Sequence, residues 1–491
     1  MARHSLVAAC GTIAIVLSAF VYVTQTNLGQ HANKDWSVWL NFPVLRDSQV
    51  VVVARKGVEE LKKRRQQLLD VGELAGWQAG DDNDDDAATN KLQEAIARSS
   101  APIGFDAGGL DYKTGLDQFP ARKKWDICTV GAGISGSVMA ERYASIANKS
   151  SLVMDIRQHI GGNCYDWRDP HTGILMNLYG AHLWHTNNER VWRYIKLFQQ
   201  NAGWKRWDHQ VVGWIDGRLL PIPVNIDTVN GLFDETIQNE TEMNHWLEGV
   251  QVPCSTTGCK NAEEMAISRV GRQLYEKIFK AYTIKQWDKT PSQLDALVTA
   301  RIPVRNNRDA RYFSDKYQVL PSKGYTQWFA GMLDHPKIDI LLGADYFRLR
   351  DALQDRCGKL IFTGPIDAYF KGHGLEKLEY RSINFKAEVM KNVGYFQPNS
   401  VVNYPGRDVN FTRIVEYKHY FHQRSPYTVI VREYSKTDGD PYYPVPNPRN
   451  HALYRKYQAL AAEEEQNKNV HFVGRLASYK VGRLRRALLF T

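Results

Sequence analysis

Residues 125–166 read WDICTVGAGISGSVMAERYASIANKSSLVMDIRQHIGGNCYD, and this stretch decides the fold. The apolar run 127–130 predicts a buried parallel strand that leads directly into the glycine turn Gly131-Ala132-Gly133-Ile134-Ser135-Gly136. Residues 137–147 keep helical spacing, and a second apolar run, 151–156, carries Asp155 about 20 residues after the turn. The stretch therefore predicts a strand, a glycine turn, a helix and a second strand, which is the start of a parallel α/β domain.

The glycine turn has the residues that a dinucleotide requires. Gly131 permits the tight turn, Gly133 lets the backbone approach a diphosphate, and Gly136 lets the helix pack close to the strand. Free N–H groups at the helix N-terminus attract phosphates, and Asp155 can accept hydrogen bonds from a ribose diol. A lone G-x-G-x-x-G is a weak signal, but in this context it predicts dinucleotide binding.

A second glycine pair, Gly161-Gly162, comes shortly after the acidic strand and is followed by Asn163. These glycines would let another loop lie against the cofactor. The pattern is more typical of FAD proteins than of NAD dehydrogenases, although an ordinary glycine loop is the alternative.

Composition excludes some classes of site and partner. The chain has 491 residues and a net charge of +10, but no block of Lys and Arg with interleaved aromatic residues, so we expect no nucleic-acid partner. Of its six cysteines, Cys254 and Cys259 could form a local bridge. His182 and His185 lack a carboxylate at a suitable spacing, and no Cys/His metal motif occurs, so we expect no metal site.

The first 120 residues differ from the rest of the chain. Residues 6–23 are apolar and uncharged, and predict a single N-terminal membrane span, with a secretory signal peptide as the alternative. The charges around this segment favour an endomembrane protein with a luminal catalytic part, but a cytoplasmic catalytic domain stays open. The acidic run 81–86 repels itself, which favours a spacer.

The remaining chain alternates between patterns. Apolar positions in 262–284 recur at helical spacing, and short alternating runs in 380–434 suit an antiparallel sheet. We expect these domains: 1–30, membrane anchor or signal segment; 31–120, a largely disordered stalk; 121–225, the first part of an FAD-binding domain; 226–300, a helical domain with a substrate lid; 301–335 and 366–450, an antiparallel sheet that binds substrate; 336–365 and 451–491, the continuation of the FAD-binding domain.

A series of motifs occurs in one order along residues 124–480: GAGISG, HIGGNCYD, YGAHLWHT, KAYTIKQW, RIPVR, RYFSD, FTGPIDAYF, LEYRS, FTRIVEYKH, DPYYPV and VGRLASYK. This ordered set resembles the bacterial type of the UDP-galactopyranose mutase family. The resemblance implies a mixed α/β fold, with an FAD-binding Rossmann-like domain, an inserted helical domain and an antiparallel six-stranded sheet domain.

The resemblance also implies an isomerase that interconverts UDP-galactopyranose and UDP-galactofuranose. In that family N5 of reduced FAD bonds covalently to the sugar and displaces UDP, and the flavin is reduced by NAD(P)H or another donor. The covalent chemistry is then the cofactor's, and the protein supplies position and charge. A homo-oligomer is a further expectation.

The resemblance assigns roles residue by residue. Arg301 and Arg413 match the diphosphate-clamping arginines, and His182 matches a histidine beside the flavin; these three are the predicted catalytic group. The predicted substrate-binding residues are Tyr282, Thr283, Trp287, Arg301, Tyr312, Asn403, Arg413, Tyr442 and Tyr443. The predicted cofactor-binding residues are Gly131, Gly133, Gly136, Asp155, Gly162, Asn163, His182, Gly474 and Arg475. From the residues alone, each arginine could equally be a surface ion-pair partner, and Tyr282 a core residue.

The C-terminus departs from the family. After GRLASYK, Val481 stands at a substrate-contacting tyrosine position and Arg483 at an acidic one. Either activity is lost or this ending is not the natural one; the intact internal motifs favour the second. The alternatives are a flavin amine oxidase-like oxidoreductase, which would consume oxygen, and an inactive UDP-sugar-binding relative. An anchored glycosyltransferase would need a D-x-D motif in a strand–loop context, which the sequence lacks.

Overall fold

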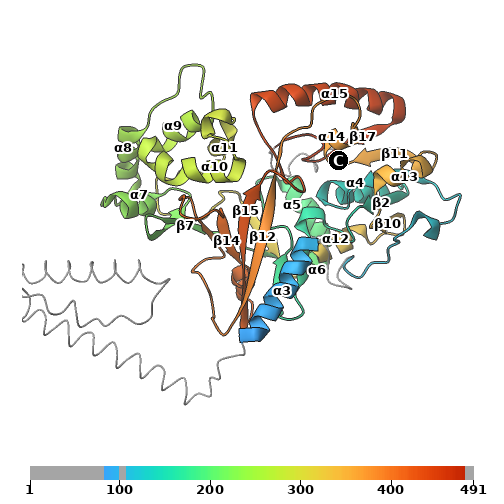
Figure 1. Ribbon diagram of the computed structural model, residues 1–491, viewed down its shortest axis with the longest axis horizontal. Coiled ribbons are helices and arrows are strands. Elements are labelled where there is room, and N and C mark those ends of the chain that lie inside the picture. Colours follow the sequence, from blue (N-terminus) through green and yellow to red (C-terminus); the bar gives the residue numbers. More distant parts are fainter. Residues whose placement is uncertain (1–81, 99–106, 481–491) are drawn as a thin grey trace, which may run out of the picture. The chain divides into compact units, whose positions relative to one another are not determined.

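A five-stranded parallel sheet forms around β1, the strand that precedes the glycine turn. The computed structural model describes residues 82–98 and 107–480, and Figure 1 shows this sheet beside the long antiparallel strands. The order of its strands is β10 (Ile338–Leu342), β2 (Ser151–Asp155), β1 (Trp125–Val130), β11 (Cys357–Phe362) and β17 (Val470–Phe472). All four pairings are parallel. The predicted mixed α/β fold with a Rossmann-like domain is thereby confirmed.

Helices cover both faces of the parallel sheet. On one face Ile127 and Ile361 pack against Met139 of α4 (Ile134–Ser145). On the other face Cys128 and Leu152 belong to a buried cluster with the helices that follow later in the chain. These helices are α13 (Tyr346–Leu353), α14 (Ile366–Tyr369) and α15 (Pro448–Lys468). Because apolar side chains leave both faces, β1 and β2 show continuous apolar runs rather than alternation.

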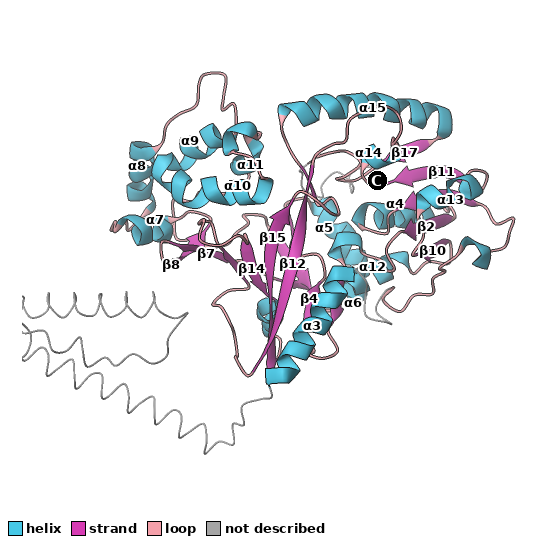
Figure 2. Cartoon of the chain, in the orientation of Figure 1, coloured by secondary structure: helices cyan, strands magenta, loops and turns pink. Residues whose placement is uncertain are grey.

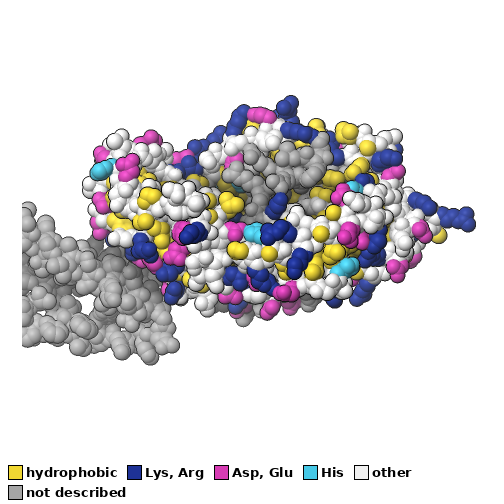
Figure 3. Space-filling model, turned by 90° about the horizontal axis from the view of Figure 1, so that it is seen from above, with side chains coloured by type: hydrophobic (Ala, Val, Ile, Leu, Met, Phe, Trp, Pro, Cys, Tyr) yellow, Lys and Arg dark blue, Asp and Glu magenta, His cyan; other side chains and the backbone are white. Residues whose placement is uncertain are grey.

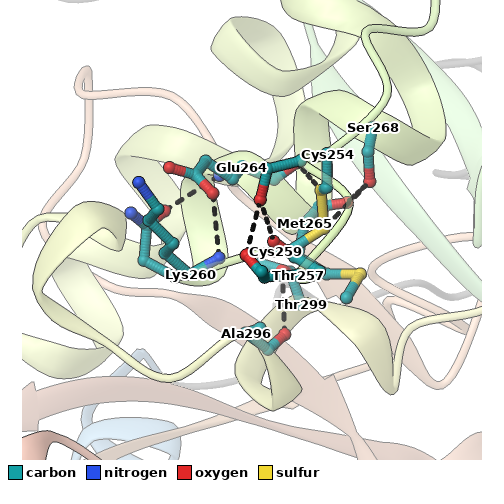
Figure 4. The surroundings of a disulfide bond; sticks show 12 residues. Cys254, Thr257, Cys259, Lys260, Glu264, Met265, Ser268, Ala296 and Thr299 are labelled. Atoms are coloured by element: carbon teal, nitrogen blue, oxygen red, sulfur yellow. Dashed lines mark hydrogen bonds between the residues drawn. A yellow bond between two sulfur atoms is a disulfide. The ribbon is translucent and has the colours of Figure 1, made fainter.

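Two disulfides lie in the described residues. Cys128 on β1 bonds Cys357 on the neighbouring strand β11 across a sequence separation of 229 residues. The sequence does not reveal this bridge, because nothing before the fold says that the two strands are adjacent. Cys254–Cys259 closes a loop of five residues' separation, as predicted, and Figure 4 shows this loop against α9 (Ala262–Leu274).

The second large sheet has seven strands within the described residues (Figure 2). Their order is β16 (Tyr443–Pro444), β12 (Tyr380–Lys391), β15 (Tyr427–Lys436), β14 (Arg413–Glu416), β13 (Val401–Asn403), β7 (Val211–Ile215) and β8 (Arg218–Ile222). Its β13–β7 pair is parallel and the others are antiparallel. The prediction of six antiparallel strands therefore misses the β7–β8 hairpin, which comes from residues before the helical section and adds to the sheet through β13.

Helix α3 (Asp82–Arg98) lies along the open edge of β12 (Figure 1). Its side chains replace a missing strand: Asp85, Thr89 and Gln93 accept the backbone N–H groups of alternate β12 residues. Residues 82–98 fall in the predicted stalk, and the expectation of disorder does not hold for them. The acidic run favours the N-terminus of a helix, where the dipole stabilises negative charge, and the apolar residues that follow give the helix a face to bury.

The helical section contains α7 (Ile226–Phe233), α8 (Glu240–Val250), α9, the π-helix η5 (Tyr275–Lys280), α10 (Ala281–Trp287) and α11 (Leu297–Ala300). The predicted single helix over 262–284 is interrupted. Gly271 has φ +76°, and a Cβ there would lie 2.6 Å from the Val250 carbonyl oxygen. The close approach of α8 thus requires a glycine and breaks the regular helix, and η5 re-aims the following turn of α10.

The remaining elements surround a cluster of tryptophans. Trp184, Trp204 and Trp328 lie with ring centres between 5.3 and 5.9 Å apart. The elements are β3 (Asp166–Arg168), β4 (Leu175–Asn177), β5 (Trp184–Thr186), β6 (Trp204–Arg206), β9 (Tyr317–Pro321), α5 (Glu189–Ile195), α6 (Gln199–Ala202) and α12 (Tyr325–Leu333). They join the two large sheets into one unit from residue 82 onward.

The predicted membrane localisation is corrected. Among the helices that the structure describes, none combines the length and the apolar composition that a bilayer span requires. The proposed span at residues 6–23 lies outside the described residues, as does the divergent ending at residues 481–491.

Candidate active site

The glycine turn leaves β1 with the close approaches that its residue types imply. Gly131 has φ +107°, and a Cβ on it would lie 2.1 Å from Oγ1 of Thr363. A Cβ on Gly136 would lie 1.9 Å from the carbonyl oxygen of Gly131, so the first turn of α4 packs directly on the strand end. No described side chain caps the N-terminus of α4, and its first turn holds no acidic residue. Its N–H groups therefore remain free to bind phosphate.

Two further loops meet the glycine turn. A Cβ on Gly162 would lie 2.8 Å from Cα of Gly133, and a Cβ on Gly474 would lie 2.7 Å from Oγ of Ser135. Gly161-Gly162 and Gly474 come from distant parts of the chain, yet each needs glycine because another backbone or side chain approaches it. The structure brings together the glycines that the sequence predicted as cofactor residues, which are Gly131, Gly133, Gly136, Gly162 and Gly474.

Asp155, at the end of β2, closes the turn. Its Oδ2 accepts the Ala132 N–H at 2.8 Å and its Oδ1 accepts the Arg157 N–H at 2.9 Å, while burial raises its pKa above the ordinary value. The guanidinium of Arg157 also donates to Oδ1 of Asn163 at 2.8 Å and lies 4.2 Å from the ring centre of Tyr179. An open helix N-terminus, a glycine cradle and an acid at the strand end fit the diphosphate and ribose of FAD.

Arg413 is the centre of a second group of residues. It begins β14, directly opposite Asn403 of β13 and Glu433 of β15. Its Nε donates to Oε2 of Glu433 at 2.6 Å. Burial opposes the charged form, but the Glu433 carboxylate and the neighbouring phenols raise the pKa of Arg413 well above its ordinary value. The guanidinium is therefore charged and oriented by a buried carboxylate.

Aromatic side chains surround Arg413. Tyr282 and Tyr443 lie within its electrostatic range, and Tyr312 lies beside Tyr282. Burial raises the pKa of Tyr282 to about 12, so its hydroxyl stays protonated at neutral pH. The guanidinium carbon of Arg475 is 5.2 Å from the ring centre of Tyr443. Tyr282 thus belongs to this group rather than to the core alone, and the Arg475 loop connects the group to the glycine turn.

The pair Tyr442 and Tyr443 divides between two environments. Tyr443 faces Arg475 and lies 6.4 Å, between ring centres, from Trp287. Tyr442 is buried, and packs near Tyr179 and Phe385 instead. Of the two tyrosines predicted as substrate-binding, Tyr443 is the one that the structure places beside the Arg413 group.

His182 lies between the two groups. Its Nδ1 donates to the Gly180 carbonyl at 2.8 Å, and burial lowers its pKa to about 4, with Arg475 and Arg413 acting in the same direction. The imidazole is therefore neutral at physiological pH and cannot add a positive charge. His185, close by in the sequence, instead pairs with Asp315 through Nδ1 at 2.7 Å.

Of three further predicted substrate residues, one is exposed and two are buried. Arg301 is exposed after α11, and its guanidinium makes no hydrogen bond or ion pair with another described residue. Trp287 is only 3% exposed, in a cluster with Leu294 and Val298, and Thr283 is also buried. Their substrate roles stay predictions, and a buried Trp287 would have to move to act as part of a lid.

Sequence reasoning missed two residues of this group. Glu433, which orients Arg413, is 1% exposed, and its Oε1 accepts no hydrogen bond from a described residue. His209 is also buried near Arg413, its Nδ1 has no described partner, and burial lowers its pKa to about 3. Neither sits in a quoted motif with a charge pattern of its own. Glu433 is placed by the pairing of β15 with β14, and His209 by the loop between β6 and β7. On the face drawn in Figure 3, basic side chains are spread among acidic and apolar ones.

A glycine cradle on a parallel sheet, joined to an arginine and tyrosine group on an antiparallel sheet, defines a dinucleotide-cofactor enzyme. Two family models match: an NAD(P)-binding Rossmann-like domain over residues 129–198 and UDP-galactopyranose mutase over residues 277–481. The chain belongs to the UDP-galactopyranose mutase family and is a flavin-dependent isomerase. The resemblance drawn from the motifs is confirmed.

Individual relatives support the family over most of the chain. A Klebsiella pneumoniae protein described as "Probable UDP-galactopyranose mutase" is 36% identical, over 72% of this chain and 90% of its own length. A dTDP-fucopyranose mutase of Escherichia coli is 33% identical, over 72% of this chain and 93% of its own. A crystal structure of reduced UDP-galactopyranose mutase shares the fold, with a TM-score of 0.56 and 16% identity over 74% of this chain and 93% of that one.

Proposed function

We propose that this chain interconverts UDP-galactopyranose and UDP-galactofuranose. The observation that carries the proposal is the group around Arg413, where a charged, partly exposed guanidinium held by a buried carboxylate meets Tyr282, Tyr443 and a neutral His182 next to the glycine cradle. A sugar nucleotide that loses its diphosphate from the anomeric carbon needs such a positive, aromatic-lined site beside its cofactor.

Arg413 binds the diphosphate in this proposal. The planar fork of a guanidinium suits phosphate oxygens, and Glu433 holds one N–H of the fork so that the remaining donors keep their direction. Tyr443 and Tyr312 add hydroxyl groups that can donate to phosphate oxygens, and Tyr282 offers a flat ring to the uracil. In this proposal Arg301, exposed after α11 and without a described partner, supplies a second guanidinium.

His182 and the cofactor residues act at the sugar end. Reduced FAD, when bound, supplies a nucleophilic N5 toward the anomeric carbon, and the covalent route and NAD(P)H as electron donor belong to this proposal. The neutral imidazole of His182 positions the cofactor by hydrogen bonding without competing for the negative diphosphate. The glycine cradle and Asp155 hold the FAD diphosphate and ribose.

A second sugar nucleotide is a candidate substrate, because a relative of almost equal identity is a dTDP-fucopyranose mutase. Its substrate differs from UDP-galactose in the base, the 2′-hydroxyl of the ribose and the hydroxyl at the sugar's C6. None of these differences alters the diphosphate, so the Arg413 group serves both.

Parallel assays with UDP-galactofuranose and dTDP-fucofuranose test the proposal. We expect dithionite-reduced protein to give UDP-galactopyranose with the higher kcat/KM. Faster conversion of dTDP-fucofuranose would assign the second candidate instead. Oxygen consumption with a substrate and no isomerised product would contradict both and favour an oxidoreductase.

A further inference from the structure

Arg269 on α9 holds the segment that carries Arg301. Its Nη1 donates to three backbone carbonyls, those of Thr299 at 3.1 Å, Ala300 at 3.0 Å and Ile302 at 2.6 Å. These carbonyls lie on both sides of Arg301. The Thr299 hydroxyl also donates to the Ala262 carbonyl of α9 at 2.8 Å. The turn that bears Arg301 is thus tied to α9.

Lys285 on α10 does the same for the segment that ends at Arg413. Its Nζ donates to the carbonyls of Tyr404, Val409 at 3.2 Å and Phe411 at 3.1 Å. Residues 404–411 connect Asn403 of β13 to β14, where Arg413 pairs directly opposite Asn403. One ammonium therefore sets the shape of the loop between two predicted substrate residues.

The two cations share an unusual environment. Each is half-buried, and neither makes an ion pair with a described carboxylate. Burial lowers the pKa of Lys285 to about 8, with Asp408 acting weakly in the opposite direction, and burial also lowers the pKa of Arg269. A buried charge is costly unless its hydrogen-bonding partners repay it. Here the partners are carbonyls, which hold the cation but do not neutralise it.

We propose that Arg269 and Lys285 are positioning residues. Arg269 holds segment 299–302, which bears Arg301, and Lys285 holds segment 404–411, which leads to Arg413, in the arrangement that receives the diphosphate of the sugar nucleotide. The inference rests on the proposed function. It also explains how one helical section can hold both segments. Helices α9 and α10 carry the two cations, and α10 also carries Tyr282. The uncompensated charges add a favourable potential for a dianionic ligand.

The test compares Arg269→Met and Lys285→Met, which keep the length of the side chain but remove its charge and its donors. The probe is UDP, measured by calorimetry on FAD-loaded protein, together with KM and kcat. We expect the Kd for UDP and the KM to rise about tenfold, with kcat changing less, because ground-state and transition-state binding weaken together. The absorbance spectrum of bound FAD should not change.

Lys418→Met is the matched control, because Lys418 is a buried lysine directly after β14 whose Nζ also donates to a backbone carbonyl, that of Gly394, at 2.9 Å. It should leave the Kd for UDP unchanged. Lys285→Arg should recover most of the affinity. If a methionine variant does not fold, Lys285→Gln and Arg269→Gln retain one donor and should show the same rise in Kd.

If folded methionine or glutamine variants bind UDP as tightly as the wild type, the inference is overturned and the proposed function is not. The same holds if Lys418→Met loses as much affinity for UDP as they do. Wild-type protein that binds UDP but isomerises nothing, with weaker binding in both variants, would contradict the proposed function and support the inference. Wild-type protein that does not bind UDP would contradict both.

Discussion

At the scale of single residues, the site depends on one ion pair, in which the carboxylate is buried and the arginine is partly exposed. Arg413 and Glu433 face each other across β14 and β15, and the carboxylate is almost fully enclosed. A buried charge left without its partner is far more costly than an exposed one. The same sheet offers a comparison, since Arg432 and Glu388 form a cross-strand pair whose two side chains are 27% and 41% exposed.

Glu433→Gln should lower the free energy of unfolding by about 2 kcal/mol, the range of a hydrogen bond between charged groups, because the Arg413 guanidinium then loses a carboxylate that is only 2% exposed. Glu388→Gln, the exposed counterpart, should cost at most about 1 kcal/mol. Urea denaturation of both variants measures the difference. Equal effects would mean that the Glu433 carboxylate is not what stabilises Arg413.

Two histidines whose pKa values are lowered predict that the folded state loses stability in acid. Burial lowers the pKa of His182 to about 4 and that of His209 to about 3. The folded protein therefore binds fewer protons than the unfolded chain below the unfolded pKa of about 6.5. Stability should be full above this pH and fall as the pH drops toward 4, by up to about 1.4 kcal/mol per pH unit for each histidine.

His209→Gln removes one of these two imidazoles. The decline in unfolding free energy between pH 6.5 and 4 should therefore become shallower, by up to about 1.4 kcal/mol per pH unit. Denaturation curves at several pH values measure the slope. His245→Gln, at an exposed position of α8, controls for the substitution itself. An unchanged slope in His209→Gln would show that this imidazole is not held neutral in the folded state.

At the scale of elements, α3 and β12 match each other in spacing. Asp85, Thr89 and Gln93 are four residues apart on the helix, and they accept the N–H groups of Lys391, Val389 and Ala387, two residues apart on the strand. Four residues of helix rise about 6 Å and two residues of strand about 6.6 Å, so the two ladders stay in register. Gln93 also donates to the Phe385 carbonyl at 2.9 Å.

The double variant Thr89→Val with Gln93→Leu should weaken the packing of α3 on the edge of β12. Three hydrogen bonds are lost, those that Thr89 and Gln93 accept and the one that Gln93 donates to the Phe385 carbonyl. We expect the free energy of unfolding to fall by about 3 kcal/mol, at about 1 kcal/mol per bond, and amide exchange to become faster at Ala387 and Val389. An uncovered edge strand also pairs with other chains, so self-association should increase. Asn90→Val with Lys91→Leu, on the exposed face of α3, should change neither exchange rate. Unchanged exchange in the first variant would mean that α3 does not protect β12.

The elements also show what the sequence predicts and where prediction ends. The unit from β1 to β2 could be predicted because its apolar periods, glycines and acid are local. The packing of α3 on the edge of β12 could not be predicted, because β12 lies about 300 residues further along the chain and the acidic composition of α3 favours solvation. Cys128–Cys357 and the contact of Glu433 with Arg413 have the same cause: each requires knowledge of which strands are neighbours.

At the scale of the whole molecule, three distant pieces of chain converge on one site. The glycine turn follows β1, the Arg475 loop follows β17, and Arg413 begins a strand of the other large sheet. Motif order was enough to predict the family, and the local pattern was enough to predict which glycines meet at the turn after β1, since glycines are required there by backbone geometry. It was not enough to separate Tyr443 from Tyr442 or to find Lys285 and Arg269, whose partners are backbone carbonyls and leave no pattern in the sequence.

The measurement that tests the central claim most directly is conversion of UDP-galactofuranose by a single preparation, assayed after dithionite reduction and again after reoxidation in air. The account predicts UDP-galactopyranose from the reduced sample, little from the reoxidised one, and recovery on a second reduction. A flavin-loaded, reduced protein that binds UDP but gives no pyranose product would contradict it.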